Sequence, residues 1–204
     1  MDILRNISLL LLLLVSIQVN AQRTQRIEFD AKQKAFLEEQ ALARVRTFQE
    51  NCAKVGSKSN SKSEKELTIK ETLRLFVDNL RTIQVTNSDG SVQRPKKIEI
   101  YLTRLMLLGY KEIEITSSDF HISTDLKPSA SMNAKYPGED WYEGVCSVIQ
   151  HFRAKRFEYE YIDTVKREFT VYLRKVEIYE GAEKNISWQV FIGDIQAHTI
   201  SVGF

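Results

Sequence analysis

The chain contains few residues of the kinds that build specialised scaffolds. Two cysteines are too few for a disulfide framework or a four-thiolate zinc site. Eight glycines and three prolines among 204 residues exclude a fibrous or low-complexity protein. Lys and Arg total 29 and Asp and Glu total 27, so we expect no nucleic-acid partner, which would call for a basic excess. The remaining composition is typical of a globular protein with a single domain.

The longest apolar run lies at the N-terminus and is too short to span a bilayer. Leucine fills positions 9–14, whereas a membrane helix needs about 20 apolar residues. Val19-Asn20-Ala21 places small or aliphatic residues at the two positions that a signal peptidase reads. We predict that residues 1–21 are a signal peptide cleaved before Gln22, with an uncleaved anchor as the alternative. The protein is therefore expected to be exported to the periplasm or outside the cell and to leave the membrane after cleavage.

Export leaves two alternatives open for the cysteines. A disulfide between Cys52 and Cys146, 94 positions apart (146 − 52), could persist outside the cytoplasm. It would contribute roughly 4–5 kcal/mol in the chain-entropy description. Cys52 also continues the apolar stripe of a predicted helix, and Cys146 lies inside a strand pattern. Both positions suit two buried free thiols, which is the alternative that the pattern favours.

The first half of the mature chain is predicted to be helical after a flexible lead-in over residues 22–28. Apolar residues at three- and four-residue steps predict one helix over 30–55, ended by Gly56, and a second over 64–80. Ser63-x-x-Glu66 fits a capping box for the second helix. A third helix is predicted to start at Pro95 and to stop at Gly109, after a small hairpin whose turn is Asn87-Ser88-Asp89-Gly90.

The second half of the chain alternates apolar and polar residues, which predicts strands over 111–115, 141–156, 165–179 and 188–202. Short turns between the last three strands imply an antiparallel meander. Residues 123–140 contain two prolines and little periodicity, and they are predicted to form a long loop. The expected core combines apolar positions from both halves: Val45, Phe48, Leu73, Phe76, Leu105, Phe169, Val171 and Leu173.

The last strand carries apolar residues in two sets that cannot share one face of a regular ladder. Trp188, Val190 and Ile192 have one parity, and Ile195, Ala197 and Thr199 have the other. One inserted residue would bring both sets to the same face. We therefore predict a β-bulge at Gly193-Asp194, where glycine supplies the backbone freedom and Asp194 points outward.

This order of elements resembles the nuclear-transport-factor-2-like fold, also called the cystatin-like α+β cone. The resemblance covers residues 29–202 and includes a closing strand of the pattern Trp188-x-Val190-x-Ile192-Gly193-Asp194-Ile195. It implies an α+β domain over residues 29–204, in which three helices and a small hairpin pack on a strongly curved antiparallel sheet. Because that fold hosts isomerases, dehydratases and interaction modules, the resemblance implies no particular activity.

Few residues suggest chemistry. Asp119 and His121, two positions apart, would share a strand face and could form an acid–base pair. Asp194 is a second candidate base, although a Gly-Asp pair in a strand favours a bend. The three histidines are too dispersed for a metal site, and we expect no cofactor. The basic and aromatic stretch over residues 152–167 is locally neutralised by acidic residues, which predicts a solvated mixed surface.

Two functional hypotheses follow. The first is an exported, non-catalytic module that binds an unknown protein or a small apolar ligand, with a homodimer through the sheet as one arrangement left open. The second is a small enzyme of the isomerase or dehydratase type, acting between the first helix and the sheet. A cone filled with hydrocarbon would favour the first. A pocket of about 300 Å³ or more, with Asp, His or Tyr at its floor, would favour the second.

Overall fold

The computed structural model describes residues 29–87, 90–181 and 183–199. The predicted signal peptide (1–21) and lead-in (22–28) lie outside the described residues, so these two predictions stay untested. Residues from Ala31 onward form one compact α+β unit. No helix in the described part of the chain is both long and apolar enough to cross a membrane.

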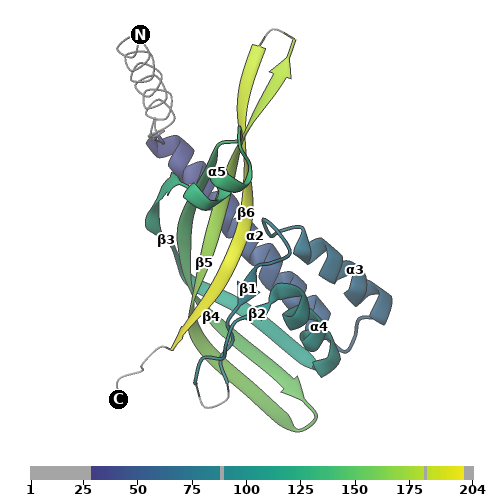
Figure 1. The fold of residues 1–204 in the computed structure, drawn as a ribbon. Helices are drawn as coiled ribbons and strands as arrows, with labels where there is room; N and C mark the ends of the chain where they lie inside the picture. The colour runs from purple at the N-terminus through teal and green to yellow at the C-terminus, as the bar shows by residue number, and fades with distance from the viewer. Residues whose placement is uncertain (1–28, 88–89, 182, 200–204) are drawn as a thin grey trace, which may run out of the picture. The chain divides into compact units, whose positions relative to one another are not determined.

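Four long strands, β3 to β6, follow one another in meander order, as the alternating patterns predict, and two short strands, β1 and β2, precede them. The strands are β1 (Thr82–Ile83), β2 (Lys96–Lys97), β3 (Glu112–Pro128), β4 (Trp141–Arg156), β5 (Tyr159–Glu180) and β6 (Glu183–Thr199). They form one six-stranded sheet in the order β2-β1-β6-β5-β4-β3 (Figure 1). The pairs are antiparallel except for the parallel pair of β1 with β6. The α+β class is therefore confirmed.

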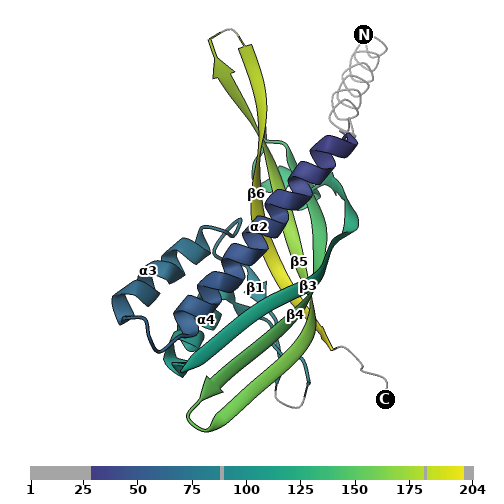
Figure 2. The same cartoon turned by 180° about the vertical axis from the view of Figure 1, so that it is seen from behind.

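The helices α2 (Ala31–Gly56), α3 (Lys62–Leu73) and α4 (Ile98–Leu108) cover one face of this sheet. The short α5 (Ala130–Lys135) packs on the opposite face, where its Met132 contacts Trp141 and Tyr172. The long α2 runs diagonally across the sheet, with α3 and α4 beside its C-terminal half (Figure 2). Its Phe48 ring meets the rings of Phe76 and Phe169 edge-on, with centroids 5.6 Å and 6.2 Å apart. These three rings form the centre of the core, where Phe169 is completely buried.

The second helix is shorter than predicted and starts on a different cap. It ends at Leu73 instead of position 80, because the next segment pairs with the sheet. Val77 N–H donates to the Ile192 carbonyl and Ile192 N–H donates to the Leu75 carbonyl. These sheet hydrogen bonds replace the next helical turn. The predicted core residue Leu73 is consequently only half-buried, and Leu80, the last residue of the predicted helix, is 61% exposed.

The capping box is present, but two residues earlier than predicted. Ser61 accepts from the Glu64 N–H, and the Glu64 carboxylate accepts from the Ser61 N–H at 2.7 Å. The predicted pair, Ser63 and Glu66, has the same spacing, so sequence spacing alone does not distinguish the two registers.

The predicted loop over 123–140 is wrong. The structure continues β3 to Pro128 and then forms α5 on the N-cap Ser129. β3 is an edge strand whose register shifts three times, and Asp119 adopts a φ of +50°. The shifts disrupt the two-residue alternation, which hides the strand from a periodicity reading. Pro128 is tolerated because it lies at the end of an edge strand.

The predicted bulge in β6 is confirmed. Phe169 pairs with Ile195 and Val171 pairs with Ile192, so two residues of β6 oppose one residue of β5. The apolar residues on both sides of the bulge are buried: Val190, Ile192, Ile195 and Ala197. Outside this stretch Trp188 is half-buried, and Thr199 is exposed.

The reason for glycine in the bulge differs from the predicted one. Gly193 does not have a positive φ. A Cβ at this position would lie 2.5 Å from Cε2 of Tyr172, which real Cβ atoms do not tolerate. Glycine is therefore required by the close approach of a ring and not by a left-handed backbone.

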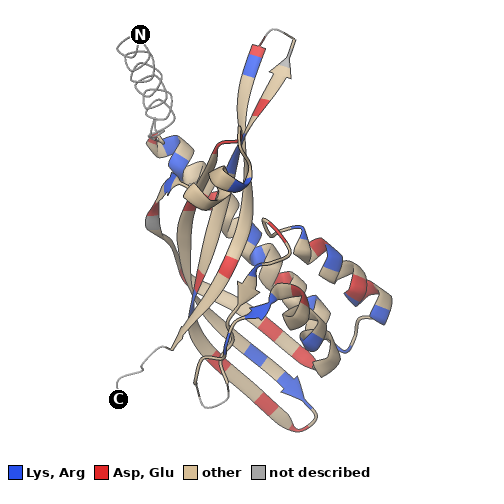
Figure 3. Cartoon of the chain, in the orientation of Figure 1, with Lys and Arg blue, Asp and Glu red and all other residues tan. Residues whose placement is uncertain are grey.

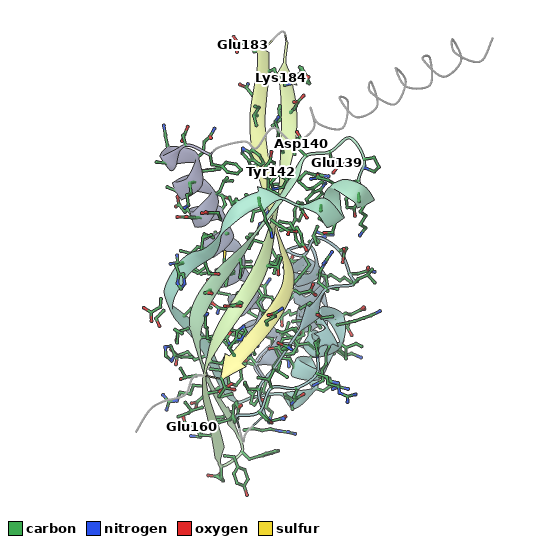
Figure 4. The ribbon with its side chains drawn as sticks, turned by 60° about the vertical axis from the view of Figure 1, so that its left-hand side comes forward. Glu139, Asp140, Tyr142, Glu160, Glu183 and Lys184 are labelled. Atoms are coloured by element: carbon green, nitrogen blue, oxygen red, sulfur yellow. The ribbon has the colours of Figure 1, made fainter. Side chains whose placement is uncertain are left out.

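β5 and β6 extend beyond the rest of the sheet. β4 begins at Trp141 opposite Arg174, so residues 175–180 of β5 pair only with 183–188 of β6. This two-stranded arm carries Glu183 and Lys184 at its tip, while Glu160 lies in the β4–β5 hairpin at the other end of the sheet (Figure 4).

Candidate functional site

A cavity lies between α4, the hairpin segment that precedes it, and the helix-facing side of β4 and β5. Its volume is about 350 Å³. Because strand side chains alternate, each strand presents every second residue to this space. β4 contributes Gln150 and Phe152, and β5 contributes Tyr161, Asp163 and Arg167. The described side chains leave this space unfilled.

Arg167 is the only cation of the cavity wall that is almost fully buried in the described structure, with 6% of its surface exposed. Its Nη1 donates to the Gln84 carbonyl, whereas its Nε has no hydrogen-bond partner among the described residues. No described carboxylate lies within 4 Å of it. Burial lowers the pKa of Arg167, but an arginine stays protonated in proteins. A charge is thus held in the wall without a direct counter-ion.

Tyr101 places a hydroxyl beside this cation. α4 carries it, and it hydrogen-bonds the thiol of Cys52 on α2. Burial raises the pKa of Tyr101 well above its usual range, so the phenol is neutral. Burial likewise raises the pKa of Cys52 to about 12, so its thiol is not a nucleophile at neutral pH.

Aromatic rings form another part of the wall. Phe152 meets Tyr110 and Tyr161 edge-on, with ring centroids 6.1 Å and 5.7 Å apart. Burial raises the pKa of both tyrosines, which keeps them neutral. Such rings offer flat apolar surface with a hydroxyl at one end.

The charges of the wall are unbalanced. Of the described residues that line the cavity, Lys96, Arg104 and Arg167 are cationic, and Asp163 is the one anion. The Asp163 carboxylate accepts a hydrogen bond from the Thr86 hydroxyl. The lining therefore has a formal charge of +2 (3 − 1). Over the rest of the sheet and helices both signs are interspersed (Figure 3).

Asp119 and His121 do not form the predicted acid–base pair. Both are exposed at the irregular stretch of β3, away from the cavity. The His121 Nδ1 lies 3.0 Å from the backbone carbonyl of Asp119, and no hydrogen bond joins the imidazole to the Asp119 carboxylate in the described structure. The left-handed backbone of Asp119 separates the two side chains, which a regular strand would have kept on one face.

Asp194 has a structural role. Its carboxylate accepts from the backbone N–H and the hydroxyl of Thr82, at 2.7 Å and 2.8 Å, and it pairs with Arg81 at 3.4 Å. It therefore ties the short β1 to the bulge of β6. Arg81 also pairs with Asp78 at 2.9 Å, and Lys135 pairs with the same carboxylate at 3.0 Å.

The pKa of Asp78 shows that this ion network favours the charged carboxylate. Burial alone would raise the pKa, but the hydrogen bonds from Arg81 and Lys135 hold it below its usual range. The network joins the loop after α3 to α5 and β6.

Of the two alternatives for the cysteines, the structure contains the buried free thiols and not the disulfide. Cys52 lies on α2 and Cys146 on β4. Burial raises the pKa of Cys146 to about 12 as well.

The described residues contain no group of three His, Cys, Asp or Glu side chains that could hold a metal ion. No protein-family model, no curated protein and no solved structure matches the chain.

Sequence reasoning missed the cavity residues, although a usable signal exists. Arg167 lies midway between Val165 and Phe169 and has the same parity as the buried set of β5. A charged residue at an inward position predicts a buried charge. The mixed charges over residues 152–167 predicted a solvated surface for the whole stretch. For Arg167 and Phe152 that prediction is wrong, because both line the cavity.

Proposed function

We propose that this chain has a nuclear-transport-factor-2-like fold and binds a small organic molecule in the cavity between α4, the hairpin and the sheet. The observation that carries the proposal is the unfilled volume of about 350 Å³, which lies in the usual range of small-molecule pockets. Its wall combines aromatic surface with a few polar groups, and the long α2 packed on a curved antiparallel sheet supports the fold assignment.

A thermal-shift screen of small organic acids, amides and alcohols tests this function. Leu108 lines the rim of the cavity and is 38% exposed, so Leu108→Trp should obstruct the cavity without disturbing the core. The neighbouring Leu107 is 73% exposed and does not line it, which makes Leu107→Trp the matched control. We expect hits that are lost in Leu108→Trp and kept in Leu107→Trp. Hits that survive in both variants would place binding elsewhere.

A second candidate is a proton-transfer enzyme of the isomerase or dehydratase type. The observation in its favour is that the cavity exceeds 300 Å³ and contains one carboxylate, Asp163, together with neutral tyrosines. Asp163 would be the base and the phenols would stabilise negative charge on the substrate. Once a ligand is known, Asp163→Asn should abolish deuterium exchange at its acidic carbon. If exchange is unchanged in Asp163→Asn, or if the wild type shows no exchange, the enzyme hypothesis is rejected and only the binding function remains.

Export is part of the proposal and rests on the pattern of residues 1–21. N-terminal sequencing of the protein from its native host should begin near Gln22, and an intact Met1 on the mature protein would contradict it. A homodimer through the sheet is a separate prediction that sedimentation equilibrium tests.

A further inference from the structure

The inward face of β5 holds a buried cation that has no ion-pair partner among the described residues. A guanidinium taken out of water costs several kcal/mol unless a counter-ion and hydrogen bonds compensate it. Arg167 has one hydrogen bond, to a neutral carbonyl, and its Nε has no partner in the described structure. Its nearest acidic neighbour in the wall, Asp163, is hydrogen-bonded to Thr86 and lies beyond ion-pair distance. Folding alone gives no reason for a charge here.

We propose that the ligand of the cavity is a small organic monoanion with a flat, apolar body, and that its anionic group pairs with Arg167. This inference rests on the proposed binding function and names the ligand class of that site. An anion that enters the cavity supplies the counter-charge that Arg167 lacks. The hydroxyl of Tyr101, which hydrogen-bonds the Cys52 thiol in the same wall, stays neutral and does not repel the anion.

The charges of the wall favour one negative charge over two. Arg167 is the buried cation, whereas Arg104 is exposed and Lys96 donates to Gln93. A dianion such as a phosphate monoester would need a second desolvated cation or a group of backbone N–H donors, and Asp163 would repel it. A planar guanidinium matches a carboxylate or a sulfonate, and both belong to the proposed class.

The rings define the body of the ligand. Phe152, Tyr110 and Tyr161 present edges and faces within one wall, which favours an aromatic or flat alicyclic skeleton over a flexible chain. The volume of about 350 Å³ limits the ligand to a few fused or linked rings.

Isothermal titration with four matched probes tests the inference on the full mature chain. The probes are 2-naphthoate, 2-naphthalenesulfonate, 2-naphthamide and 2-naphthyl phosphate, which share one ring system. We expect the two monoanions to bind at least tenfold more tightly than the amide and than the phosphate. Arg167→Gln should remove that preference, and Arg74→Gln, which changes an exposed arginine that does not line the cavity, should alter affinity less than threefold.

Two further variants separate binding from folding. Arg167→Lys keeps the charge and loses the planar fork, so it should retain part of the preference for naphthoate. Leu108→Trp should weaken all probes together, because it obstructs the cavity and not the charge. Thermal unfolding of each variant confirms that the chain is folded when binding is measured.

The outcomes distinguish the two levels of the proposal. If 2-naphthamide binds as tightly as 2-naphthoate in the wild type, the anion inference is overturned and the binding function stands. If the phosphate binds more tightly than the carboxylate, the monoanion class is overturned. If Arg167→Gln is folded and keeps the preference, Arg167 is not the anchor. If no probe binds and the thermal-shift screen gives no hit, the binding function itself fails.

Discussion

Replacing Gly193 with alanine tests the packing at the β6 bulge. The added Cβ would lie 2.5 Å from Cε2 of Tyr172 and 3.1 Å from Cβ of Thr170. The Tyr172 ring cannot move freely, because it is buried and packs with Trp141. The guanidinium of Arg81 also lies 5.2 Å from its ring centroid. Overpacking a rigid core costs about 1–3 kcal/mol, and we expect Gly193→Ala to lower the free energy of unfolding by that amount.

A double-mutant cycle assigns this cost to the ring. Tyr172→Ala removes the clashing atom, so Gly193→Ala should cost less than about 0.5 kcal/mol in that background, giving a coupling energy of at least about 1 kcal/mol. Urea unfolding followed by tryptophan fluorescence measures all four species. An equal cost of Gly193→Ala in both backgrounds would show that the strain is in the backbone and would refute the close-approach explanation. A cost below about 0.5 kcal/mol in the wild type would refute any requirement for glycine.

Three other predictions concern stability and reactivity. Phe169→Ala should lower the free energy of unfolding by about 3–5 kcal/mol, because its ring is completely buried and packs against the ring of Phe48; a loss below about 1 kcal/mol in urea would contradict its placement. The folded-state pKa of Asp78 is depressed, so its contribution is present above the unfolded pKa of about 3.9 and is lost as pH falls through the folded value. Thermal unfolding between pH 2 and 6 should therefore decline less steeply in Asp78→Asn, and parallel curves would argue against the network. Cys52 and Cys146 should react with a thiol reagent only after unfolding, since burial raises both pKa values to about 12; fast labelling of the native protein would contradict this.

Much of the sheet can be predicted from the sequence because strand side chains alternate strictly. The strand predicted over 141–156 has the same bounds as β4. The change of parity after Ile192 predicts the bulge without any knowledge of the partner strand, since both apolar sets must reach one core. The sequence also shows a glycine at the bulge, but it does not show why glycine is required there. Glycine is required because the register of β5 brings the ring of Tyr172 against Gly193.

Boundaries set by distant hydrogen bonds could not be predicted in the same way. The helix that starts after Ser61 ends at Leu73 because the following segment bonds with Ile192, more than one hundred positions away. Local propensity contains no trace of that partner. The irregular part of β3 could not be predicted for a different reason. Its register shifts remove the alternation of apolar and polar residues on which a strand assignment depends. The Asp119–His121 pair failed for this reason.

We propose that the inward face of β5 combines a core segment and a ligand-binding segment along a single strand. Phe169, Val171 and Leu173 lie at its centre and are fully buried in the core. Toward the strand's N-terminal end the same face carries Arg167 and Asp163, where α4 and the hairpin leave a cavity unfilled. Phe169 and Arg167 therefore face the same side of the sheet, but one packs in the core and the other lines the cavity. Substituting Phe169 should reduce stability, whereas substituting Arg167 should change ligand preference in a protein that still folds, because a buried charge without a counter-ion contributes little to folding.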